Sequence, residues 1–64
     1  MFGKTLCNLR KGRQLSQKAL AEKANLSLNM VGLLERGRRN PSLITVVKLA
    51  KALRVNASKF FDEL

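Results

Sequence analysis

Residues 16–36 read SQKALAEKANLSLNMVGLLER, and this stretch predicts two short helices joined by a tight turn. Ser16 and Ser27 stand where the helices would begin, because a serine hydroxyl accepts from free backbone N–H groups one turn further on. Asn25 tolerates the left-handed conformation that ends many helices. The apolar residues that recur at helical spacing are Leu20, Ala24, Leu26, Val31 and Leu34. They predict a steep crossing of the two helices, with an outward face on the second.

The flanking sequence predicts three more helices. The first covers about residues 2–13, and its end near Gln14 lacks a glycine stop. Gly37 ends the helix over 28–36, and Pro41 disfavours helix in the residue before it. Ser42 caps a helix from Leu43 to about residue 54, and a short fifth helix follows Asn56 and brings Phe60 into the core. The inward stripe predicted on the helix after Ser42 comprises Leu43, Val46, Leu49, Ala50 and Leu53. We therefore predict one all-α domain of five short helices over residues 1–64.

Charge and composition narrow the possible functions. The 64 residues carry a net charge of +9, which indicates an anionic partner, with nucleic acid favoured over a membrane surface. With one cysteine, no histidine and scattered acids, the chain lacks the usual groups of metal sites and nucleophilic catalysis. The sequence thus predicts no enzyme activity, no metal, no cofactor and no small-molecule substrate. It also contains no apolar run long enough for a membrane span, and we expect a cytoplasmic protein.

Several short motifs carry a resemblance to a known family. They are Ser16-Gln17, Leu20-Ala21, Glu35-Arg36-Gly37, Asn40-Pro41-Ser42 and Leu49-Ala50 with Leu53. In order and spacing, the chain from about residue 6 to residue 64 resembles the lambda-repressor-like, Cro/C1-type helix-turn-helix family, also called the XRE family. The resemblance implies that the helix over 28–36 reads the major groove of double-stranded DNA. It also implies a bacterial or phage-encoded, nucleoid-associated transcriptional regulator of the repressor type. Such a regulator would bind inverted repeats as a homodimer, at least on DNA.

The expected phosphate contacts lie at helix N-termini and in a basic loop. Helix N-termini offer free N–H groups and a positive dipole end to anions. The resemblance also implies an ion pair between Arg10 and Glu35, which would fasten the first helix to the helix over 28–36 and aim the arginine at a phosphate. Arg36 is expected to contact a phosphate, and a guanine base is the alternative contact. The predicted phosphate contacts are Arg10, Gln17, Ser27, Arg36, Arg38, Arg39 and Asn40.

The expected base contacts lie on the outer face of the helix over 28–36. They are Leu28, Asn29, Gly32 and Leu33, with Met30 at the margin. An asparagine amide can make two hydrogen bonds to adenine, and leucine can meet thymine methyl groups. An alternative is that Leu28, Met30 and Leu33 form a protein-binding surface. In that case the chain would be a protein-interaction module, such as an antitoxin-type or coactivator-type adaptor.

A second apolar surface is expected near the C-terminus. Ile44 and Val47 fall outside the predicted inward stripe, and Phe61 and Leu64 lie close to the chain end. These four residues form a predicted dimer contact. Ordinary packing of the fifth helix on the fourth explains the same pattern, and Phe2 is expected to cover this region. Cys7 is expected to be a small residue of the first helix.

Overall fold

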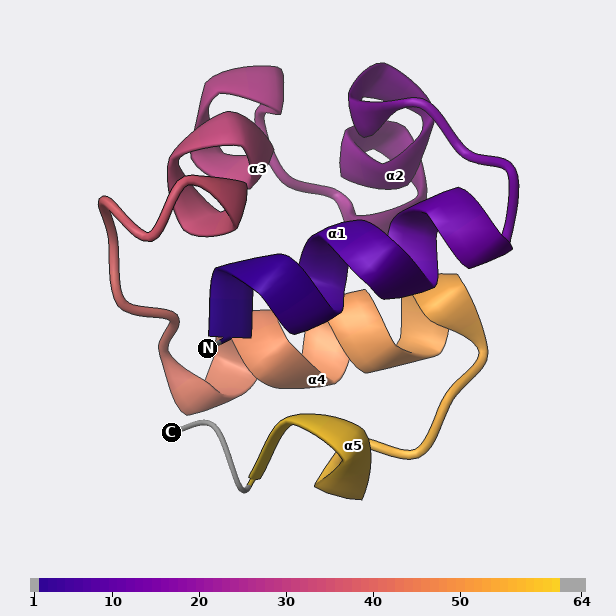
Figure 1. Cartoon of the computed structure of the whole chain (residues 1–64), viewed down its shortest axis with the longest axis vertical. Coiled ribbons are helices and arrows are strands. Elements are labelled where there is room, and N and C mark those ends of the chain that lie inside the picture. The colour runs from indigo at the N-terminus through magenta and orange to yellow at the C-terminus, as the bar shows by residue number, and fades with distance from the viewer. Residues whose placement is uncertain (1, 62–64) are drawn as a thin grey trace.

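The computed structural model describes residues 2–61 of the chain. Figure 1 shows α2 and α3 together at the top of the molecule, α1 across the middle, and α4 and α5 below. α3 packs on α1 and on α2, and α2 also packs on α4. The helices of this range, which contains no strand, are α1 (Phe2–Gly12), α2 (Gln17–Ala24), α3 (Leu28–Glu35), α4 (Leu43–Leu53) and α5 (Ser58–Phe61). The predicted all-α, five-helix fold is confirmed.

Three helices begin at a serine, as the sequence predicts. The hydroxyl of Ser16 accepts a hydrogen bond from the Ala19 backbone N–H at 3.0 Å, which caps α2. Ser27 caps α3 and Ser42 caps α4 in the same way. Each cap satisfies a backbone donor that has no partner within its helix, and such a cap stabilises a helix by about 1 kcal/mol.

The helix ends agree with the sequence at two places and differ at two others. Asn25 and Gly37 adopt left-handed conformations, with φ of 57° and 71°. The first helix ends at Gly12, and Gln14 takes the left-handed turn although it is not a glycine. α4 ends at Leu53 because Arg54 is left-handed, with its N–H directed at carbonyl groups of the last turn. Neither Gln14 nor Arg54 is a residue type that predicts this conformation.

The core contains residues from both ends of the described chain. Phe60 is fully buried, as predicted, and its ring lies against that of Phe2, with 5.1 Å between the centroids. Aromatic pairs at this distance add to the free energy gained by burial alone. The other buried apolar residues are Leu6, Leu20, Ala21, Ala24, Val31, Leu34, Val46, Leu49, Ala50 and Leu53.

The first turn of α4 corrects one predicted core residue. Leu43 is 67% exposed, although the spacing places it on the same stripe as Val46. Side chains of a helix lean towards its N-terminus, so the first residue of α4 points past the end of the helix rather than into the core. Ile44 and Val47 are exposed, as expected. Leu64 and the side chain of Phe61, the other two predicted dimer contacts, lie outside the described part of the structure.

α1 approaches the end of α3 so closely that position 3 has room only for glycine. A Cβ atom at Gly3 would lie 2.5 Å from the carbonyl oxygen of Leu34 and 2.6 Å from that of Glu35. Both oxygens belong to the backbone of α3, which cannot swing aside as a flexible side chain can. Gly3 therefore sets the distance between α1 and the helix that carries the candidate site.

Candidate nucleic-acid interface

The outer surface of α3 presents fewer apolar side chains than its sequence suggests. Leu28 is 51% exposed and Asn29 is exposed, while Leu33 is half-buried. Met30 is also half-buried and packs against the core. Of the three residues in the alternative protein-binding patch, Leu28 alone is therefore exposed. The two most accessible of the predicted base contacts lie at the N-terminal end of α3.

Gly32 is a predicted base contact that the structure does not leave open. It is buried, and the Arg36 guanidinium lies close to it. A Cβ atom at position 32 would be 3.8 Å from both terminal nitrogens of Arg36. A long side chain in a helix leans back over the preceding turn, which explains why Arg36 covers this surface. Gly32 is therefore not an open position in the free protein, and its base contact stays a prediction.

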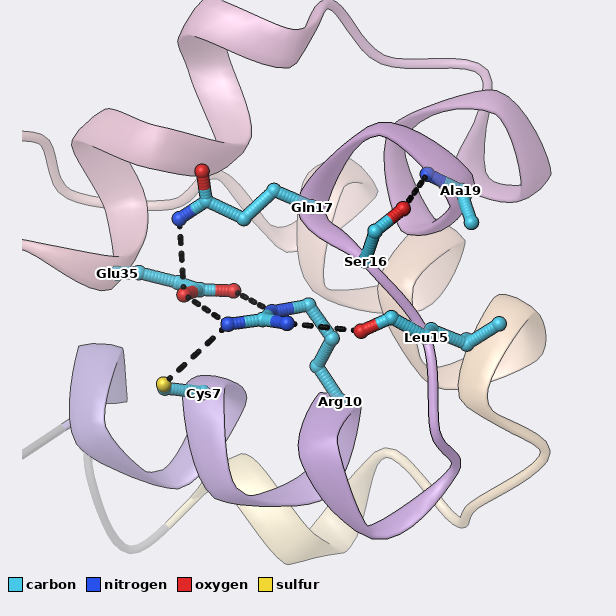
Figure 2. Close-up of polar contacts among 7 residues, drawn as sticks. All are labelled: Cys7, Arg10, Leu15, Ser16, Gln17, Ala19 and Glu35. Atoms are coloured by element: carbon cyan, nitrogen blue, oxygen red, sulfur yellow. Dashed lines mark hydrogen bonds and ion pairs between the residues drawn. The ribbon is translucent and has the colours of Figure 1, made fainter.

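The structure brings Arg10, Gln17 and Glu35 together into one polar network between α1, α2 and α3 (Figure 2). The Arg10 Nε donates to Glu35 Oε2 at 2.6 Å, and Nη2 donates to Oε1 at 3.2 Å. Gln17 Nε2 donates to the same Oε1 at 3.1 Å. Both side chains of the ion pair are well buried, with 12% of Arg10 and 6% of Glu35 exposed. The network fastens the C-terminal end of α3 to both neighbouring helices.

The remaining donors of Arg10 also point into the protein. Its Nη1 donates to the Leu15 carbonyl oxygen at 2.8 Å, and Nη2 lies 3.6 Å from Cys7 Sγ. These contacts occupy most of the guanidinium donor capacity, so Arg10 acts first as a clamp between α1, the following loop and α3. The phosphate contact of Arg10 remains a prediction, because it depends on the guanidinium N–H donors that these bonds leave free.

The other predicted phosphate contacts lie at exposed positions around α3. Ser27 caps α3 by accepting a hydrogen bond, which leaves its hydroxyl proton available to an anion. Gly37, with its left-handed backbone, turns the chain out of α3 into an exposed basic loop. The predicted phosphate contacts in this loop are Arg36, Arg38, Arg39 and Asn40. No hydrogen bond or ion pair within residues 2–61 engages their side chains.

A comparison with known protein families identifies the family to which this arrangement of helices belongs. The helix-turn-helix family model, HTH_3, matches residues 8–60. The chain belongs to the helix-turn-helix family. The match confirms the resemblance to Cro/C1-type, XRE proteins, and α2 and α3 are the two helices that give the family its name.

Relatives of this helix-turn-helix domain are named as repressors and regulators. The immunity repressor protein of Bacillus phage phi105 is 44% identical over 61 residues, which are 95% of this chain and 42% of that protein. The uncharacterized HTH-type transcriptional regulator y4dJ of Sinorhizobium fredii is 38% identical over 88% of this chain and 73% of its own length. The crystal structure of the restriction-modification controller protein C.AhdI from Aeromonas hydrophila has a TM-score of 0.91 and 43% identity, over 94% of this chain and 91% of that one. The chain thus spans less than half of the phage repressor and most of the controller protein.

Two members of the polar network could not be assigned from the sequence of this helix-turn-helix domain. Leu15 contributes a backbone carbonyl oxygen, which any residue possesses, and Cys7 contributes a weak sulfur acceptor. The bond from Gln17 to Glu35 joins residues that lie 18 positions apart. No sequence signal predicts this bond. Glu35 is one of four acids in the chain and sits beside the buried Leu34, which supports only its predicted pairing with Arg10.

Two further findings bear on other kinds of site. No helix between residues 2 and 61 combines the length and the apolar character that a membrane crossing requires. Within the same range, histidine, cysteine and acidic side chains form no group of three that could hold a metal ion.

The network shifts the pKa values of both partners in the ion pair. Burial alone would raise the pKa of Glu35, but hydrogen bonds from Arg10 and Gln17, together with the positive charge of Arg10, lower it on balance. The hydrogen bond with Glu35 is the main reason that the pKa of Arg10 is raised, although burial opposes this effect. Each charge therefore stabilises the other in the folded state.

We expect the stability of the domain to fall in acid because Glu35 must then accept a proton. Its pKa in the folded state lies below the ordinary 4.5, so the stabilisation is complete above 4.5 and is lost as the pH falls through the lowered value. Urea unfolding across this pH range should reveal the loss. Glu35→Gln should be less stable at neutral pH and should lose part of the pH dependence. Glu22→Gln removes an exposed carboxylate of α2 and is the matched control. A Glu35→Gln profile parallel to that of the unchanged protein would contradict the prediction.

Proposed function

We propose that this helix-turn-helix domain is a sequence-specific, DNA-binding transcriptional regulator of the repressor type that places α3 in the major groove. The observation that carries the proposal is the fixed position of α3 beside a basic loop. The ion pair at Glu35 holds the C-terminal end of α3, and the exposed Arg38 and Arg39 follow directly. A helix that enters the groove needs both features, because phosphate contacts set its register while its outer face reads the bases.

In this proposal, phosphate contacts provide affinity and base contacts provide sequence specificity. Gln17 and Ser27 stand at helix N-termini, where the dipole favours a phosphate. Together with the basic loop they would supply affinity that depends on salt but not on sequence. Asn29 is the strongest base-reading candidate, since it is exposed and its amide can pair with adenine.

The proposal includes a homodimer on an inverted repeat. Ile44 and Val47 form an exposed apolar surface on α4, where a second copy could pack, with Phe61 and Leu64 as the further predicted contacts. The net charge of +9 opposes association of two free copies, so DNA would favour the dimer by neutralising that charge. The half-sites would lie about one helical turn apart. We propose a cytoplasmic protein without enzyme activity.

The test is selection of the purified chain against a random library of duplex DNA at near-physiological salt. Enrichment of an inverted repeat is expected and would establish both the sequence specificity and the dimer. Enrichment of a single half-site would support the regulator but contradict the dimer. Salt-sensitive binding without any enriched sequence would refute sequence-specific regulation and favour the adaptor alternative.

We expect Asn29→Ala and Arg38→Ala to have different effects on the selected site. Asn29→Ala should relax the preference at one base position, by a free energy of about 1–3 kcal/mol, because it removes a base contact. Arg38→Ala should weaken binding to all sequences similarly and should reduce the slope of log K against log salt by about 0.9. Fluorescence anisotropy with matched and mutated duplexes measures both quantities. Equal losses of Asn29→Ala on every sequence would rule out its base-reading role.

A further inference from the structure

The Arg36 side chain lies across the outer surface of α3 instead of extending towards the loop. α3 ends at Glu35, and Arg36 continues the helical path as its C-cap, with φ of −83°. Its side chain runs back over the preceding turn, and the guanidinium lies close to Gly32. The guanidinium carbon would lie 3.9 Å from a Cβ atom at position 32. The planar group therefore sits on the surface of α3 itself.

Nothing within the described protein uses the hydrogen-bonding capacity of this guanidinium. Arg36 is exposed, and no hydrogen bond or ion pair joins its side chain to another residue of the range 2–61. The adjacent acid, Glu35, is already occupied by Arg10 and Gln17 on the side that faces α1 and α2 (Figure 2). The guanidinium of Arg36 thus lies against α3 near Gly32, while its donors stay available to a ligand.

The position of the guanidinium relates it to Asn29. Residues 29 and 36 lie two helical turns apart on nearly the same face of α3, and the arginine leans back towards the asparagine. The two side chains therefore bring two planar groups to one stripe of the helix. The arginine fork matches O6 and N7 of guanine, as the asparagine amide matches adenine.

We propose that Arg36 reads a guanine base in the major groove from its position near Gly32, instead of contacting a phosphate. The inference rests on the proposed function, because it assumes that α3 enters the groove. The half-site is expected to contain a guanine near the adenine that Asn29 reads.

The test repeats the duplex selection and the anisotropy measurements with Arg36→Lys and Arg36→Ala. Lysine keeps the charge but lacks the planar fork, so Arg36→Lys should lose the guanine preference at one position by roughly tenfold or more. The salt dependence should stay nearly unchanged. Arg13→Lys is the matched control, since its guanidinium donates to the Arg54 carbonyl oxygen and is not part of α3. It should keep the whole selected sequence.

Two results would overturn the inference in different ways. If Arg36→Lys keeps the guanine preference while Arg36→Ala weakens every sequence equally and flattens the salt slope, Arg36 contacts phosphate. The proposed function would survive that result. If the unchanged protein enriches no sequence, the proposed function fails, and base reading by Arg36 fails with it.

Discussion

Gly3→Ala is expected to lower the free energy of unfolding by about 2–3 kcal/mol. The added Cβ would have to fit 2.5 Å from the Leu34 carbonyl oxygen and 2.6 Å from that of Glu35. Relief requires α1 and α3 to move apart, and this would disturb the neighbouring Arg10–Glu35 pair and the packing of Phe2. Such a loss is a large fraction of the total for so small a domain. Urea denaturation followed by circular dichroism measures it.

Gly12→Ala is the matched control because it makes the same change in the same helix. No atom outside the local backbone lies within 4 Å of a Cβ at position 12, and Gly12 has no positive φ that would strain an alanine. Since glycine costs a helix up to about 1 kcal/mol relative to alanine, Gly12→Ala should raise the free energy of unfolding. The two substitutions should therefore move the denaturation midpoint in opposite directions. A rise in the midpoint for both substitutions would mean that helix propensity, and not close approach, governs position 3.

The parts of the fold that the sequence predicts correctly depend on local chemistry. Serine caps at 16, 27 and 42 and the left-handed Asn25 and Gly37 each follow from a residue and its near neighbours. Gly3 differs because its role depends on the backbone of α3, which lies far away in the sequence. A glycine in the first turn of a helix gives no hint of such a distant contact. Leu43 fails for a related reason, since helical spacing describes the direction of a side chain but not whether anything covers it.

The candidate site shows the same division between pattern and geometry. The outward face of α3 could be predicted at Leu28 and Asn29, whereas the burial of Gly32 could not. The approach of the Arg36 guanidinium to Gly32 depends on a rotamer, and helical spacing contains no information about rotamers. The Arg10–Glu35 pair came from family resemblance, because no periodicity relates two residues in different helices. Its links to Gln17 and Leu15 emerged only from the folded geometry.

Removing one partner of the Arg10–Glu35 pair is expected to lower the free energy of unfolding by about 3 kcal/mol or more, a larger effect than that of Gly3→Ala. Arg10→Met keeps a long apolar side chain but leaves the carboxylate of Glu35 buried, with Gln17 as its remaining donor. Glu35→Leu leaves the Arg10 guanidinium with only the Leu15 carbonyl oxygen and Cys7 sulfur as acceptors. In each case an uncompensated charge stays in a poorly solvated position, which is more costly than the loss of attraction alone.

The double variant Arg10→Met with Glu35→Leu separates these two costs. Because it leaves neither charge behind, it should be more stable than either single variant, with a coupling energy of about 1–3 kcal/mol. Arg10→Met combined with Glu22→Gln, an exposed acid of α2, is the control pair and should show additive losses. DNA binding by the double variant then distinguishes two roles of the pair. If stability recovers but specific binding does not, the polar network orients α3 for its groove; if both recover, the pair serves folding alone. Additive losses for Arg10 and Glu35 would contradict direct coupling between them.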